Sequence, residues 1–108
     1  MQLLPDELRA EISTLYSQET VKTEEKAVYA KFFFSEGRWT WFVTEVKKQE
    51  NDFVFFGYVI GFVEELGYFT LNELQSINIK VLGVERNLYF KPGKFVDVIA
   101  QFQKERGQ

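Results

Sequence analysis

The sequence contains no cysteine and no histidine. Without cysteine, the chain has no disulfide, no thiolate metal site and no cysteine nucleophile. Without histidine, it lacks the usual general base near neutral pH and the commonest metal ligand. An enzyme built from this chain would therefore depend on carboxylates, lysine, tyrosine or serine.

Long apolar runs and an excess of basic residues are missing as well. No apolar segment approaches the roughly 18 residues of a membrane-spanning helix. The first residues, MQLLPDEL, do not show the basic and then apolar order of a signal peptide. We expect a cytoplasmic protein without membrane contact. The net charge of −3 argues against binding of duplex phosphates, because such binding needs a basic surface.

Aromatic residues, in contrast, are abundant. Twelve Phe, five Tyr and two Trp make up 18% of the 108 residues. The core is therefore expected to consist largely of aromatic rings. A chain of this length is expected to fold as a single compact domain, residues 1–108, that buries about two-thirds of its unfolded surface.

Apolar spacing predicts a helix near each end of the chain. LLPDELRAEISTLYSQ (3–18) has one apolar face, and Pro5 suits the first turn. PGKFVDVIAQFQKER (92–106) places four apolar residues on one stripe. The polar residues 17–26 are expected to form a connection, and to be the most mobile segment.

The middle of the chain alternates with the period of strands. AVYAKFFFS (27–35) and RWTWFVTEVKK (38–48) predict a hairpin in which Gly37 supplies a positive φ. FVFFGYVIGFV (53–63) is apolar on both faces, which predicts the longest strand, covered on both sides.

A short helix is predicted in GYFTLNEL (67–74). Thr70 and Glu73 have capping-box spacing there, with Phe69 and Leu74 as a hydrophobic staple. One or two short strands are predicted in residues 78–90. The fold class is α+β: an antiparallel sheet of about four strands, N- and C-terminal helices packed on it, and a short helix between strands.

The stretch WTWFVTE (39–45) raises the main functional question. Strand alternation puts Trp39, Trp41 and Glu45 on one face. Either both tryptophans pack under a helix, or they form a partly open platform that stacks bases or anchors a protein partner. Gly57 and Gly61 share a strand face, and Gly57 is expected to make room for an indole.

The carboxylates are the remaining candidates for chemistry. Hydrolytic acid–base pairs and Mg²⁺ sites use acidic residues that converge from separate strands. The candidates are Glu45, Glu64, Glu65, Glu73 and Glu85. They lack any accompanying catalytic pattern, so a salt-bridged rim is the simpler interpretation. Arg86 is expected to hold Glu45 or Glu64 in a bidentate pair, so that Glu45, Glu65, Glu85 and Arg86 form one cluster.

The chain resembles the bacterial and phage family catalogued as domain of unknown function 2958. The resemblance lies in LLPDELRAEISTLYSQE, KFFFSEGRWTWFVTE, FFGYVIGFVEELGYFTLNEL and VERNLYFKPG. The chain departs from the family pattern at Phe42, where Tyr is usual, and at Asn87, where Asp is usual. Each departure removes a polar group that a catalytic role would need. The resemblance implies an accessory protein of plasmids, conjugative elements or phages.

These observations predict a binding protein and not an enzyme, with no cofactor and no metal. The leading hypothesis is a protein partner from host defence or replication, because an acidic surface suits a basic, nucleic-acid-handling protein. The alternative is weak single-stranded nucleic-acid binding through the tryptophans, helped by Lys31, Arg38, Lys47 and Lys48. The candidate binding residues are Trp39, Trp41, Glu45, Glu64, Glu65, Tyr68, Glu85 and Arg86.

Overall fold

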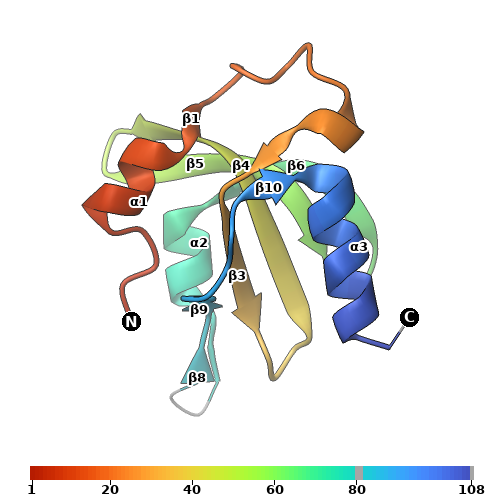
Figure 1. Ribbon diagram of the computed structural model, residues 1–108. Coiled ribbons are helices and arrows are strands. Elements are labelled where there is room, and N and C mark those ends of the chain that lie inside the picture. Colours follow the sequence, from red (N-terminus) through yellow and green to blue (C-terminus); the bar gives the residue numbers. More distant parts are fainter. Residues whose placement is uncertain (80–81, 108) are drawn as a thin grey trace.

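The computed structural model describes residues 1–79 and 82–107 (Figure 1). Its helices are α1 (Asp6–Glu11), α2 (Leu71–Ser76) and α3 (Phe95–Glu105), with a 3₁₀ turn η1 (Thr23–Glu25). Its strands are β1 (Ser13–Thr14), β2 (Ala27–Val28), β3 (Ala30–Phe34), β4 (Trp39–Gln49), β5 (Asp52–Ile60), β6 (Glu64–Thr70), β7 (Asn78–Ile79), β8 (Leu82–Gly83), β9 (Glu85–Arg86) and β10 (Gly93–Lys94).

A six-stranded sheet organises the fold. Its order is β6-β5-β4-β3-β9, and all these neighbours are antiparallel. The sixth strand, β1, runs parallel to β4 beyond the point where β3 stops pairing. The predicted α+β class is confirmed. The sheet is wider than the expected four strands, because β1 lies in the segment predicted as the N-terminal helix and β6 in a segment not assigned to a strand, whereas β9 falls within the strand region predicted at residues 78–90.

Helices cover both faces of this sheet (Figure 1). Helices α1 and α2 pack on one face, where Leu4, Trp41, Phe55 and Leu74 belong to the larger apolar cluster. Helix α3 packs on the other face, where Phe102 meets Phe42 with ring centroids 5.3 Å apart. The predicted stripe of α3 is confirmed, since Phe95, Val98, Ile99 and Phe102 all join this second cluster. No helix in the described part of the chain is long and apolar enough to cross a membrane.

The N-terminal helix is shorter than predicted. It ends at Glu11, and the following residues join the sheet as β1. The backbone N–H of Leu15 donates to the carbonyl of Val46, and Tyr16 has a φ of 71°. Pairing with β4 therefore overrides the helical spacing of residues 12–16.

The middle of the chain, from β3 to α2, follows the prediction with three differences. The β3–β4 register pairs Phe34 with Trp39, but Arg38, with a φ of 57°, takes the positive φ expected at Gly37. The longest strand is β4 and not β5. Residues 67–69 belong to β6, so the helix begins only after Thr70, whose Oγ1 accepts the predicted capping hydrogen bond from the N–H of Glu73 at 3.1 Å.

Candidate functional site

A β-bulge in β4 separates Glu45 from the tryptophans. Val43 pairs with Gly57 and Glu45 with Phe56, so Thr44 is the extra residue. An extra residue reverses the alternation of faces along a strand. Trp41 and Val43 therefore lie in the cluster under α1 and α2, while Glu45 lies on the opposite face. The expectation that Trp39, Trp41 and Glu45 share one face is wrong.

Glu45 is a buried anchor for the N-terminal segment. Its side chain is 3% exposed, and its two oxygens accept hydrogen bonds from the backbone N–H groups of Tyr16 at 2.9 Å and Gln18 at 2.8 Å. The side-chain amide of Gln18, through Nε2, in turn donates to the carbonyls of Ala27 and Thr44. Tyr16 and Gln18 are thus bound to the sheet, although Gln18 belongs to the connection, residues 17–26, that was expected to be mobile.

The tryptophans differ in exposure. Trp41 is 5% exposed and belongs to the core, whereas Trp39 is only partly buried. Their rings stack with centroids 6.0 Å apart. Trp39 also meets Phe62 edge-on at 5.5 Å, and Phe62 is 95% exposed. The core interpretation of WTWFVTE holds for Trp41, while Trp39 connects the core to the surface.

At two positions in and beside β5, neighbouring atoms leave no room for a side chain larger than that of glycine. A Cβ at Gly61 would lie 2.4 Å from the Trp39 ring, so this glycine makes room for the indole. A Cβ at Gly57 would lie 1.9 Å from the backbone oxygen of Phe42, beside the bulge. The expectation that Gly57 accommodates an indole is wrong, because Gly61 does so.

The predicted carboxylate cluster does not form. Glu64 and Glu65 lie on β6, whereas Glu85 and Arg86 lie on β9, at the opposite edge of the sheet. The Arg86 Nε donates to the carbonyl of Gln2 at 3.4 Å and not to a carboxylate. Within the described residues, no three acidic side chains converge in a way that could hold a metal ion. The pairing of Arg86 with Glu45 or Glu64 is wrong.

One edge of the sheet carries an acidic and aromatic surface, which we call the β6 edge (residues 62–70). Phe62, Val63 and Tyr68 are 95%, 63% and 58% exposed, and Glu64 and Glu65 are exposed as well. The pKa of Tyr68 is raised, first by partial loss of hydration and then by the nearby charges of residues such as Glu19. The sequence prediction placed residues 67–69 in a helix and therefore missed this edge, although Gly67 disfavours a helix at that point.

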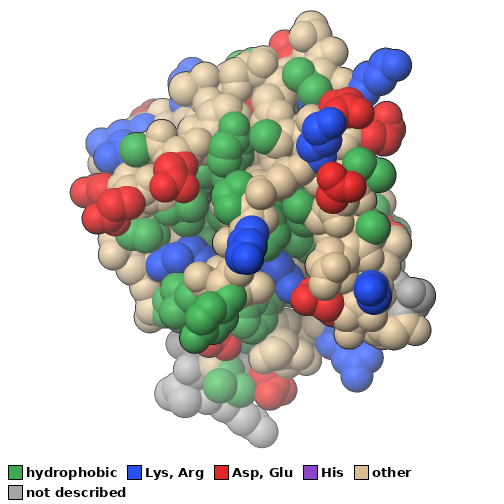
Figure 2. Space-filling model, in the orientation of Figure 1, with side chains coloured by type: hydrophobic (Ala, Val, Ile, Leu, Met, Phe, Trp, Pro, Cys, Tyr) green, Lys and Arg blue, Asp and Glu red, His purple; other side chains and the backbone are tan. Residues whose placement is uncertain are grey.

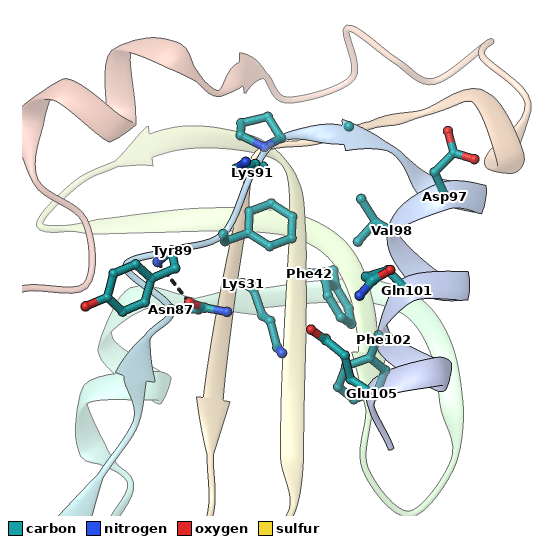
Figure 3. A pocket seen from close by; sticks show the side chains of 13 residues that line it. Lys31, Phe42, Asn87, Tyr89, Lys91, Asp97, Val98, Gln101, Phe102 and Glu105 are labelled. Carbon is teal, nitrogen blue, oxygen red and sulfur yellow. Dashed lines mark hydrogen bonds between the residues drawn. The ribbon is translucent and has the colours of Figure 1, made fainter. Parts of the chain in front are cut away.

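A concave surface lies beside α3. One hollow of about 430 Å³ is bounded by residues 87–93 and α3, and Lys31 and Glu105 point into it (Figure 3). A second hollow of about 520 Å³ shares Lys31 and Phe102 with the first. We call the two together the α3 groove. On the face drawn in Figure 2, hydrophobic side chains gather in the middle of the molecule with Lys and Arg beside them.

The cations of the α3 groove are Lys31, Arg38 and Arg106, which all line the second hollow, and Lys91, which lines the first. The Lys31 Nζ lies 4.8 Å from the centre of the Phe102 ring. Burial lowers the pKa of Lys31, and the charge of Glu105 partly opposes that shift. Lys47 and Lys48 line a different hollow, beside the N-terminal segment. The four basic residues proposed from the sequence are thus divided between two sites.

Comparisons with known proteins identify the family. No curated protein and no solved structure matches the chain significantly. A family model described as a protein of unknown function (DUF2958) matches residues 3–108. This match confirms the resemblance seen in the sequence. The chain belongs to the DUF2958 family.

Proposed function

We propose that this protein is a non-catalytic accessory protein of a mobile genetic element or phage, and that it binds a protein partner through the β6 edge. Host defence and replication proteins of the cytoplasm are the partner classes that fit. The assignment to a mobile genetic element or phage rests on the family resemblance. The choice of surface rests on the exposure of Phe62, Val63 and Tyr68 next to two carboxylates.

The composition of the β6 edge supports a protein partner. Large apolar and aromatic side chains surrounded by charge are typical of protein interaction sites. Phe62 and Tyr68 provide aromatic groups that a partner can bury. Glu64 and Glu65 provide negative charge, and β6 contains no Lys or Arg to neutralise it. A partner with a basic surface, such as a nucleic-acid-handling protein, is complementary to this edge.

The positions of the carboxylates support a role without catalysis. Both oxygens of Glu45 accept hydrogen bonds from backbone N–H groups, so this side chain has a structural task. Glu64 and Glu85 lie on opposite edges of the sheet, too far apart in the strand order to act on one substrate atom.

Capture from a nuclease-treated bacterial lysate tests the proposal with matched charge variants. The double variant Glu64→Lys with Glu65→Lys changes the β6 edge. The control, Glu7→Lys with Glu11→Lys, changes two exposed residues of α1 and alters the net charge by the same amount. We expect the same proteins to be retained by the wild type and the control and lost by the β6 variant. Equal capture by all three, or capture that nuclease abolishes, would overturn the proposal.

The α3 groove favours a second candidate function, single-stranded nucleic-acid binding. Three cations line the second hollow together with the aromatic residues Phe33, Trp39 and Phe102, and no carboxylate does. Cations beside aromatic rings are the usual elements of such sites. Glu105, which lines the first hollow, and Glu85, which pairs with Phe33, oppose the positive charge.

A salt titration with a labelled oligonucleotide tests this second candidate. We expect binding no tighter than about micromolar at physiological salt, since few phosphates would be neutralised. Submicromolar binding that weakens with salt, and that Lys31→Gln and Trp39→Ala abolish, would rank this function first. Trp39→Ala alone is not sufficient, because Trp39 also packs against the core.

A further inference from the structure

No neighbouring atom in the described part of this chain requires residue 67 to be a glycine. A glycine in the interior of a strand lowers stability and usually marks close approach by another group. Gly57 and Gly61 each have such a neighbour, but a Cβ at Gly67 would meet nothing within 4 Å. Its φ is not positive either, since Gly107 is the one described glycine with a positive φ. The space beside Gly67 is therefore open to a group from outside the chain.

The backbone of β6 is also open. Its seven residues pair with β5 without a register shift, and they include no Lys, no Pro and no bulge. Within residues 1–79 and 82–107, only β5 forms hydrogen bonds with the backbone of residues 64–69. Monomeric proteins usually protect long edge strands by one of these devices. The opposite edge, β9, has only two residues and contacts Met1 and Gln2.

We propose that β6 accepts an extended basic segment of another protein as an additional antiparallel strand, with a large side chain of that segment over Gly67. This inference rests on the proposed function and specifies its binding mode, in which backbone hydrogen bonds hold the added strand and side chains select it. The charge of Glu64 and Glu65 selects a basic segment. A second copy of this chain fits less well, because an antiparallel pair of β6 strands centred on Gly67 would place Thr70 and Phe69 opposite Glu64 and Glu65, with no cation, and a glycine opposite Gly67.

A synthetic peptide, TVYFIKR, is the probe. In the antiparallel register its Arg lies opposite Glu64, its Lys opposite Glu65 and its Phe opposite Gly67, because an aromatic side chain covers a glycine of a neighbouring strand well. The measurement is a ¹H–¹⁵N NMR titration of the full chain. We expect amide shifts within residues 62–70 and none at Glu85 or Arg86.

Backbone methylation separates strand addition from docking by side chains alone. In an added strand, alternate amides face β6 and the others face solvent. Two peptides, each with one alternate set of amides N-methylated, carry the same side chains. We expect one to bind at least about tenfold more weakly than TVYFIKR and the other to bind equally well. Glu64→Lys with Glu65→Lys should also abolish binding, whereas Glu85→Lys, on the other edge, should not.

Three results of the peptide titrations would overturn the inference. They are equal binding by both methylated peptides, shifts centred on the α3 groove, and no shifts at about 1 mM peptide. A concentration-dependent dimer that forms through β6 without peptide would also overturn it, in favour of self-association. Proteins captured through the β6 edge that leave its amides unprotected from hydrogen exchange would refute strand addition and leave the proposed function intact.

Discussion

Replacing Glu45 with glutamine tests whether this side chain anchors the N-terminal segment. The change preserves size and shape but alters hydrogen-bonding capacity. Two backbone N–H groups, of Tyr16 and Gln18, donate to separate oxygens of the carboxylate. A glutamine amide has one accepting oxygen, and its nitrogen only donates. One of the two N–H groups would therefore face another donor.

The expected loss of folding stability in Glu45→Gln is the balance of opposing contributions. A hydrogen bond to a charged group contributes about 1.5–3 kcal/mol, and an unsatisfied buried donor costs about 1–3 kcal/mol. Removal of the charge offsets part of this loss, because a buried carboxylate is poorly hydrated. We therefore expect Glu45→Gln to lower the free energy of unfolding by about 2–3 kcal/mol. The amides of residues 13–18 should lose hydrogen-exchange protection first, since β1 pairs with β4 beside Glu45.

Urea unfolding, followed by tryptophan fluorescence, measures the change. The control is Glu64→Gln, an exposed carboxylate of β6, which should stay within about 0.5 kcal/mol of the wild type. If Glu45→Gln also remained within about 0.5 kcal/mol of the wild type, the two hydrogen bonds would not anchor the segment, and the account of Glu45 would be refuted.

Further predictions concern the aromatic core, the glycines and Lys31. Trp41→Ala should lower the free energy of unfolding by about 3–5 kcal/mol and Trp39→Ala by less, and acrylamide should quench Trp39 more readily than Trp41. Gly61→Ala should reduce the Tm, because its Cβ would meet the indole, while Gly67→Ala should leave the Tm unchanged or raise it. Burial lowers the pKa of Lys31 in the folded state, so the unfolded chain binds more protons between the folded pKa and 10.5. The wild type should therefore gain stability relative to Lys31→Met as pH rises through that window in urea titrations.

Features that depend on neighbouring residues in the chain were predictable from the sequence. The stripe of α3, the β3–β4 hairpin and the cap at Thr70 each follow from local spacing, and each is confirmed. The sequence left open whether the tryptophans belong to the core. Trp41 does, in keeping with the large side chains that a helix-covered sheet needs on its inner face.

Features that depend on pairing between distant residues were not predictable. The bulge at Thr44 leaves no mark in an alternating run, yet it moves Glu45 to the face opposite Trp41. The early end of α1 depends on β4, which lies about thirty residues further along the chain. For the same reason, the assignment of Arg86 to a carboxylate cluster was wrong: the strand order places it at the far edge from Glu64.

Hydrogen exchange of the full chain, alone and with a protein captured from the nuclease-treated lysate, tests the central claim most directly. The β6 edge and the α3 groove are separate surfaces, so a single experiment distinguishes them. Addition of a partner strand at the β6 edge predicts new protection of the amides of residues 64–70, with exchange in residues 87–93 unchanged. Protection confined to residues 87–93 and α3, with β6 exchanging as in the free chain, would contradict the account.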